Sequence, residues 1–127
     1  AGYANDEQTM DAIQRIYNRY NYVLDPHTAV AQKVYEDYIG VTQDVTKTIV
    51  VATASPFKFS RSVVLAILGR DSVEGKDEFT LSDILSRISG NPTPEGLKIL
   101  KSKPILHSTK CRREDMGDVV LGMLKRQ

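Results

Sequence analysis

The sequence is poor in cysteine and in net charge, and each lack argues against a class of protein. Cys111 is the only cysteine among 127 residues, so no disulfide can form within the chain. This usage fits a reducing compartment, and we expect a cytoplasmic protein. The formal net charge of +1 gives no electrostatic reason to expect nucleic acid or a membrane surface as partner. No apolar run approaches the roughly 20 residues that cross a bilayer.

Several common catalytic motifs are also missing. The sequence contains neither C-x-x-C nor H-E-x-x-H, so no common zinc motif is present. It has no glycine-rich phosphate loop and no G-x-S-x-G nucleophile elbow. The composition, with 41% hydrophobic and 26% charged residues, is ordinary for a globular protein. We therefore expect residues 1–127 to form a single domain, and any chemistry to depend on less general motifs.

Most of the chain shows the periodicity of amphipathic helices. Apolar residues recur at three- and four-residue spacing from Asp6 to Tyr20, with Asn5 or Asp6 as a suitable N-cap. Asp25 as N-cap and Pro26 at the first helical position predict a second helix, which Gly40 would end. In all, five or six helices are predicted. A third would be capped by Ser60 and ended by Gly69, and a fourth capped by Thr80 and ended by Gly90. A short helix near Leu97 and a last one from Arg113 to Leu124 complete the set.

One segment departs from the helical period. Residues 48–53 are apolar and β-branched without alternation, which predicts a strand buried on both faces. The predicted fold class is therefore α/β, a helix-rich chain with one strand at 48–53. A lone strand cannot form a stable sheet, so we expect either a piece of a larger protein or a helical domain with a stub of sheet. The unpaired edge predicts self-association. The start at Ala1, without methionine, agrees with a processed or excised chain.

The end of this predicted strand carries the residues best suited to chemistry. Thr53 and Ser55 bring hydroxyls to a strand's C-terminal edge, where open α/β proteins bind their ligands. Lys58, between two phenylalanines, has the charge to neutralise a phosphate or a carboxylate. Each also has a plainer interpretation. Thr53 would satisfy the backbone where the strand stops, Ser55 would be a turn residue, and Lys58 a solvated lysine.

The start of the second predicted helix is the other candidate region. The helix dipole disfavours the cationic form of His27, and a neutral imidazole there can hydrogen-bond a neighbouring segment. Thr28, Ala29 and Ala31 are small, so another group can approach the first turn closely. A structural role beside the cap is the simpler interpretation of His27, and Asp25 is most simply the N-cap itself.

Two blocks of the sequence resemble one enzyme family. Residues 53–59, Thr-Ala-Ser-Pro-Phe-Lys-Phe, are similar to the T-A-[HS]-P-x-K-F segment of the threonine synthases. Residues 24–31, Leu-Asp-Pro-His-Thr-Ala-Val-Ala, resemble the D-P-H-T-A-V-[GA] segment of the same family, and the two blocks occur in the family's order. The resemblance is clearest from Gly2 to Ala66 and weaker from Asp71 to Gln127. The chain as a whole resembles roughly the last quarter of such an enzyme.

The resemblance implies a fold-type II enzyme that uses pyridoxal 5'-phosphate to convert O-phosphohomoserine and water to L-threonine and phosphate. Residues 1–70 would contribute to the cofactor-binding domain and residues 71–127 would form a helical tail. Thr53 would face the pyridine nitrogen of the cofactor, which favours that role over backbone satisfaction. The resemblance also implies that Ser55, Lys58, His27 and Thr28 line the wall of the active site.

Two departures from a complete enzyme follow from the same resemblance. Ser55 stands where many members have histidine, so any role that needs an imidazole there is in doubt. The lysine that binds the cofactor lies in the N-terminal half of the family's enzymes. The chain alone is therefore expected to hold no catalytic residue and to be inactive.

A different class of function remains open on the residues alone. A stand-alone helical module would bind a small anionic ligand or a protein surface through the turn from Thr53 to Lys58, without catalysis. The unsupported single strand counts against it. A helical nucleic-acid binder would need a basic face, and the only concentration of lysine and arginine lies within residues 98–113. With a net charge of +1, a solvated surface explains that concentration more simply.

Overall fold

The computed structural model describes residues 1–125, and every regular element among them is helical. The longest helices, α1 (Asp6–Tyr20) and α2 (Pro26–Thr42), come first, and α3 (Ser60–Leu68) and α4 (Glu78–Ser89) follow them. Short elements complete the order: η1 (Pro56–Phe59), η2 (Arg70–Ser72), α5 (Glu95–Lys98), η3 (Ile99–Ser102), η4 (Arg113–Asp115) and α6 (Met116–Leu124). The prediction of five or six helices is confirmed.

Local sequence signals explain α1. Asn5 and Gln8 form a capping box, in which each side chain bonds the other residue's backbone N–H at 2.9 and 3.0 Å. Asn21 ends the helix in the left-handed conformation, with φ of 51°, and its N–H donates to the carbonyl of Tyr17. Both ends lie where the sequence predicts them, because caps are set by a few neighbouring residues.

Three other predicted helix ends are displaced. α2 continues past Gly40 to Thr42, because Gln43 takes the left-handed cap conformation, with φ of 55°, and its N–H bonds the carbonyl of Ile39 at 2.8 Å. Ser60 is not an N-cap, since the η1 turn precedes it and its hydroxyl donates to the Phe57 carbonyl. The N-cap of α4 is Asp77, whose carboxylate accepts from the Thr80 N–H at 2.7 Å.

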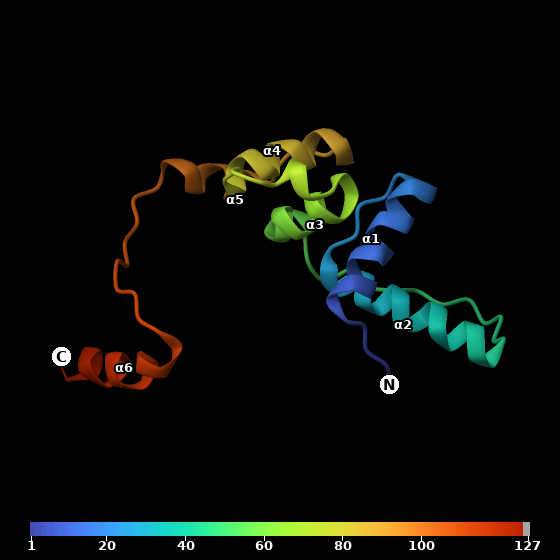
Figure 1. The fold of residues 1–127 in the computed structure, drawn as a ribbon, viewed down its shortest axis with the longest axis horizontal. Helices are drawn as coiled ribbons and strands as arrows, with labels where there is room; N and C mark the ends of the chain where they lie inside the picture. Colours follow the sequence, from blue (N-terminus) through green and yellow to red (C-terminus); the bar gives the residue numbers. More distant parts are fainter. Residues whose placement is uncertain (126–127) are drawn as a thin grey trace.

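The first four α-helices form the packed part of the chain. α1 contacts α2 and α3, and α3 contacts α4 (Figure 1). Arg15 of α1 also bonds Glu36 of α2 at 2.9 Å. The buried hydrophobic core draws side chains from all four helices and from the segments between them: Ala12, Ile13, Leu24, Ala29, Phe57, Val63, Val64, Ala66, Val73, Leu81 and Leu85.

The α/β prediction is wrong. Residues 1–125 contain no strand, and the segment from Gln43 to Ala54 runs back from α2 to η1 without regular structure. Ile49 and Val51 of the predicted strand are 88% and 71% exposed, so the expected burial on both faces is also absent. A strand needs a hydrogen-bonding neighbour, and no backbone bond to residues 48–53 is formed within residues 1–125. The apolar β-branched pattern alone does not supply that neighbour.

The end of the chain lies apart from the four packed helices. Residues 103–112 are extended and exposed, and α6 stands away from α1–α4 (Figure 1). Of the predicted tail, 71–127, residues 126 and 127 lie outside the described part. Within residues 1–125 no helix combines the length and hydropathy needed to span a membrane.

Candidate functional site

The first turn of α2 is organised around one buried carboxylate. Asp25 is only 2% exposed. Its Oδ1 accepts from the backbone N–H groups of His27 at 2.9 Å and Thr28 at 3.4 Å, and its Oδ2 accepts from the Thr28 hydroxyl. Pro26 occupies the first helical position, where a missing N–H costs nothing. Asp25 is therefore the N-cap that the sequence predicts, and it also fixes the Thr28 side chain.

These bonds change the acidity of Asp25. Burial raises the pKa of this carboxyl, but the hydrogen bonds from Thr28 and His27 together outweigh burial and leave the pKa below its ordinary value. The His27 Nδ1 atom also lies 3.2 Å from Oδ1 of Asp25, while the His27 side chain as a whole is 65% exposed. The turn thus presents a carboxylate that stays ionised and an imidazole ring held beside it.

The second block is organised by Ser55 and Pro56. The Ser55 hydroxyl accepts from the Phe57 N–H at 3.3 Å and caps η1, with Pro56 at its first position. Phe57 is buried in the core, whereas Lys58 is exposed. Ser55 is therefore a turn-capping residue here, and the aromatic residues on either side of Lys58 serve packing.

The structure brings the two blocks together through a pair of rings. The imidazole of His27 and the phenyl ring of Phe59 lie edge to face, with centroids 5.0 Å apart and planes at 61°. Thr28, next to His27, is buried, and Phe59 is partly buried against the same core. Two segments 32 positions apart in the sequence thus form one structural unit.

Thr53 lies outside this unit. It is exposed, in the extended segment that precedes Ser55, and no side-chain hydrogen bond of Thr53 is formed within residues 1–125. Neither groove described below is lined by Thr53. Its hydroxyl is accordingly available to a group outside this chain, and it does not serve to end a strand.

Lys58 lines a separate groove of about 400 Å³. The groove has an apolar floor that includes Phe57 and Leu97, and Lys98 and Lys101 reach it from α5 and η3. Acidic side chains share its rim: Glu78, which pairs with Arg61 at 2.7 Å, and Asp83. The groove therefore presents mixed charge. The sequence did not indicate it, because its lysines come from segments about 40 residues apart.

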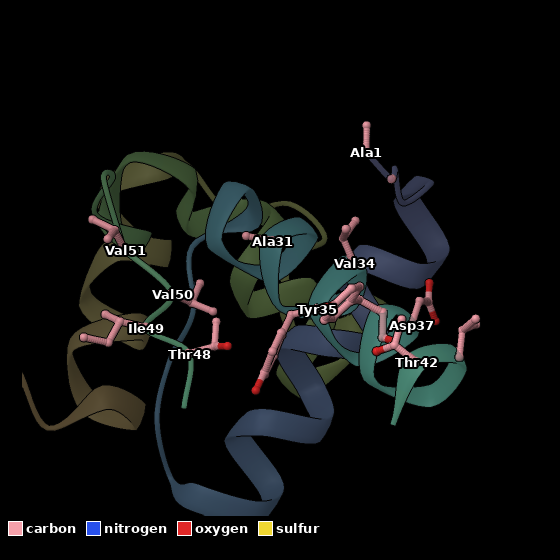
Figure 2. Close-up of a pocket in the computed structure, with 13 residues that line it drawn as sticks. Ala1, Ala31, Val34, Tyr35, Asp37, Thr42, Thr48, Ile49, Val50 and Val51 are labelled. Atoms are coloured by element: carbon pink, nitrogen blue, oxygen red, sulfur yellow. The ribbon is translucent and has the colours of Figure 1, made fainter. Parts of the chain in front are cut away.

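A larger groove, of about 730 Å³, lies beside α2. Its lining comes from the face of α2 that carries Ala31, Val34 and Tyr35, from the segment Thr48–Val51 and from the first two residues (Figure 2). Gly2 approaches α2 so closely that an added Cβ would lie 2.8 Å from a methyl carbon of Val34. The small residues at the start of α2 were the only sequence signal for this groove, and among them only Ala31 lines it.

At one end of this groove a hydrogen-bonded turn follows α2. The Tyr38 hydroxyl donates to Asp44 at 2.7 Å, and the Thr46 N–H donates to the same carboxyl at 2.9 Å. Hydrogen bonds from Thr46 and then from Tyr38 lower the pKa of Asp44 to about 2. Among residues 1–125, no cluster of three or more potential metal ligands occurs.

Comparison with known proteins finds the family that the two sequence blocks resemble, in a match that includes all of residues 53–59 and the last four residues of 24–31. The sequence model of the family described as "Threonine synthase, C-terminal" matches residues 28–105, more than half of the chain. A threonine synthase of Schizosaccharomyces pombe is 43% identical over 65 residues, which cover 50% of this chain and 12% of that protein. The chain belongs to the threonine synthase C-terminal family.

Proposed function

We propose that this chain is the C-terminal part of a threonine synthase, a cytoplasmic lyase that uses pyridoxal 5'-phosphate to convert O-phosphohomoserine and water to L-threonine and phosphate. One observation carries the proposal: the two family blocks, far apart in sequence, meet through the rings of His27 and Phe59. The chain spans about an eighth of the length of the relative it matches. The remaining substrate and cofactor contacts would come from the rest of such an enzyme.

Thr53 is the residue proposed to contact the cofactor. Its exposed hydroxyl is a neutral donor, which suits a pyridine nitrogen that stays unprotonated. The cofactor, when bound, supplies the electron sink for carbanion chemistry. The described residues fit one side of such a site and do not enclose it, since neither groove includes Thr53. We therefore derive no reaction step from this chain beyond that contact.

The other four proposed residues would form the wall beside it, with different duties. His27 and Lys58 are exposed and able to reach a bound anion. Thr28 is buried and bonded to Asp25, so it would position the turn. Ser55 caps η1 and would orient the backbone after Thr53. The proposal thus gives direct contact to His27 and Lys58 and a positioning role to Thr28 and Ser55.

The test compares the isolated chain with a longer threonine synthase that ends in it. Cofactor absorbance and phosphate release from O-phosphohomoserine are measured for both. The longer enzyme is expected to show both signals, and the isolated chain neither, because in this proposal the cofactor-binding lysine lies outside it. Turnover by the isolated chain would contradict the prediction that it is inactive. Absence of both signals from the longer enzyme would overturn the assignment to threonine synthase.

A substitution in the longer enzyme tests Thr53 itself. Thr53→Ala is expected to lower kcat about 10- to 100-fold, the range for one lost hydrogen bond to a buried group. Thr48→Ala is the matched control, because Thr48 is also exposed and lies in the same extended segment. It should leave kcat unchanged. Equal effects of the two substitutions would remove the proposed role of Thr53.

A further inference from the structure

The imidazole of His27 is held from two sides by other groups of this chain. Its Nδ1 atom lies 3.2 Å from Oδ1 of Asp25, and its ring packs against the ring of Phe59 with centroids 5.0 Å apart. Asp25 is the buried N-cap of α2, and Phe59 ends η1. The His27 side chain as a whole is nevertheless 65% exposed. The ring is therefore fixed in place while part of it still faces outward.

The contact with Asp25 decides which ring nitrogen of His27 carries the hydrogen. Burial opposes the charge of the Asp25 carboxyl, but the hydrogen bonds from Thr28 and His27 leave its pKa below the ordinary value. Asp25 is thus ionised at neutral pH, and an ionised carboxylate accepts hydrogen bonds and donates none. A hydrogen bond between this carboxylate and Nδ1 therefore requires the hydrogen on Nδ1. In a neutral imidazole the other nitrogen, Nε2, then keeps a free lone pair.

The carboxylate that orients the ring is itself held in place. Its Oδ1 accepts from the backbone N–H of His27 at 2.9 Å, and its Oδ2 accepts from the Thr28 hydroxyl. Capping of α2 explains the bonds to backbone N–H groups, but it does not require a contact with the imidazole. The same carboxylate is therefore placed to act on the ring as well as on the helix.

We propose that Asp25 is a positioning residue, which holds His27 as the Nδ1–H tautomer and leaves Nε2 as the atom that meets the substrate. The proposal rests on the proposed enzymatic function, in which His27 belongs to the wall of the active site. An unprotonated Nε2 accepts a hydrogen bond from an ammonium group, a hydroxyl or a protonated phosphate oxygen. When Nε2 gains a proton, the ring donates to an anionic oxygen instead, and Asp25 still accepts from Nδ1.

NMR of the chain labelled with ¹⁵N-histidine tests the tautomer without any substitution. The chain has two histidines, and His107 is exposed in the extended tail, so it serves as an internal reference. At about pH 8, above the ordinary imidazole pKa of about 6.5, Nδ1 of His27 should show the chemical shift of a protonated ring nitrogen and Nε2 that of an unprotonated one. His107 should show the averaged shifts of both tautomers. Averaged shifts for His27, or a hydrogen on its Nε2 alone, would overturn the proposal.

A substitution that preserves the cap separates the two roles of Asp25. Asp25→Ser keeps a good N-cap residue but removes the carboxylate, so His27 should change to the averaged shifts of His107. Asp77→Ser is the matched control, because Asp77 caps α4 with a bond from the Thr80 N–H at 2.7 Å and bonds no histidine within residues 1–125. It should leave the shifts of His27 unchanged. The same shifts of His27 with and without the Asp25 carboxylate would contradict the proposal.

Kinetics of the longer enzyme test whether Asp25 acts through His27. Asp25→Ser should lower kcat about tenfold, the smaller end of the loss typical of groups that orient a metal-bound histidine. In an enzyme that already carries His27→Ala, the same change should lower kcat no further, because no imidazole is left to orient. Additive losses, or no loss from His27→Ala alone, would overturn the positioning role. Absence of turnover in the unsubstituted longer enzyme would instead contradict the proposed enzymatic function, whichever tautomer His27 adopts.

Discussion

The rings of His27 and Phe59 lie edge to face, 5.0 Å apart, and join two segments that the sequence separates by 32 positions. On one side, Asp25 holds the turn that carries His27. On the other, Ser55 caps the η1 turn that ends in Phe59. Each of the two sequence blocks therefore supplies one half of a packed unit.

This ring pair can be measured directly. His27→Ala and Phe59→Ala, alone and combined, should give a coupling free energy near the lower end of the about 0.5–1.5 kcal/mol typical of aromatic pairs, since His27 is largely exposed. The measurement is urea unfolding of the four proteins. A control pair, Tyr3→Ala with Phe59→Ala, should show no coupling, since Tyr3 is exposed and no ring contact joins it to Phe59 within residues 1–125. Strict additivity for His27 and Phe59 would show that the contact adds nothing to stability.

The Asp25 cap predicts a specific loss of stability in acid. The pKa of Asp25 is lower in the folded chain than in the unfolded one. The ionised carboxylate therefore contributes fully to the free energy of unfolding above the ordinary carboxyl pKa of about 4, and this contribution is lost as the pH falls through the pKa of the folded chain. Asp25→Ala should cost about 1–2 kcal/mol at neutral pH, the range for a lost N-cap. Asp25→Asn keeps a capping side chain.

The comparison of these variants separates capping from charge. Unfolding by urea is measured at about pH 7 and about pH 3. Asp25→Asn should lose less stability between the two values than the unsubstituted chain, because the ionisable group is gone. Asp6→Asn is the control, since Asp6 is exposed in the first turn of α1. Identical pH dependence for Asp25→Asn and the unsubstituted chain would contradict the lowered pKa.

Helices α1 and α2 could be predicted from the sequence because their signals are local. The capping residues Asn5 and Asp25 act on N–H groups two or three positions away. The exact end of α2 could not be predicted in this way, since Gly40 is tolerated inside the helix and Gln43 adopts the left-handed cap. A glycine costs only about 1 kcal/mol within a helix, too little to end one by itself.

The predicted strand at 48–53 was wrong because a strand depends on a partner that its own residues do not specify. The candidate site could be predicted only where its residues lie close together in the sequence. Asp25, His27 and Thr28 are neighbours in sequence, so their shared turn followed from the pattern. The groove lined by Lys58, Lys98 and Lys101 did not, because these lysines are about 40 residues apart in the sequence and share a groove only in the folded chain.

Two glycines with different backbones make a matched pair of substitutions. Gly90 ends α4 in the left-handed region, with φ of 67°, where a β-carbon is strained although space is open around it. Gly90→Ala should therefore destabilise the chain by about 1 kcal/mol. Gly96 lies within α5, also in open space, and there alanine should be neutral or stabilise by up to about 1 kcal/mol. Thermal unfolding of both variants checks the difference in sign, and equal shifts would contradict it.

The core between α3 and α4 predicts the largest effect of a single substitution. Leu81 is fully buried, together with Val63, Val64 and Leu85. Leu81→Ala should lower the free energy of unfolding by about 2–5 kcal/mol, since it removes buried methyl groups and leaves a cavity. Leu106→Ala deletes the same atoms from a residue that is 80% exposed, and it should change stability by less than about 0.5 kcal/mol. The slope of the free energy of unfolding against urea concentration reports the surface exposed on unfolding. If this slope is the same for both variants, the difference in stability arises in the native core. Comparable losses for the two leucines would mean that the packing of α3 on α4 does not stabilise the chain.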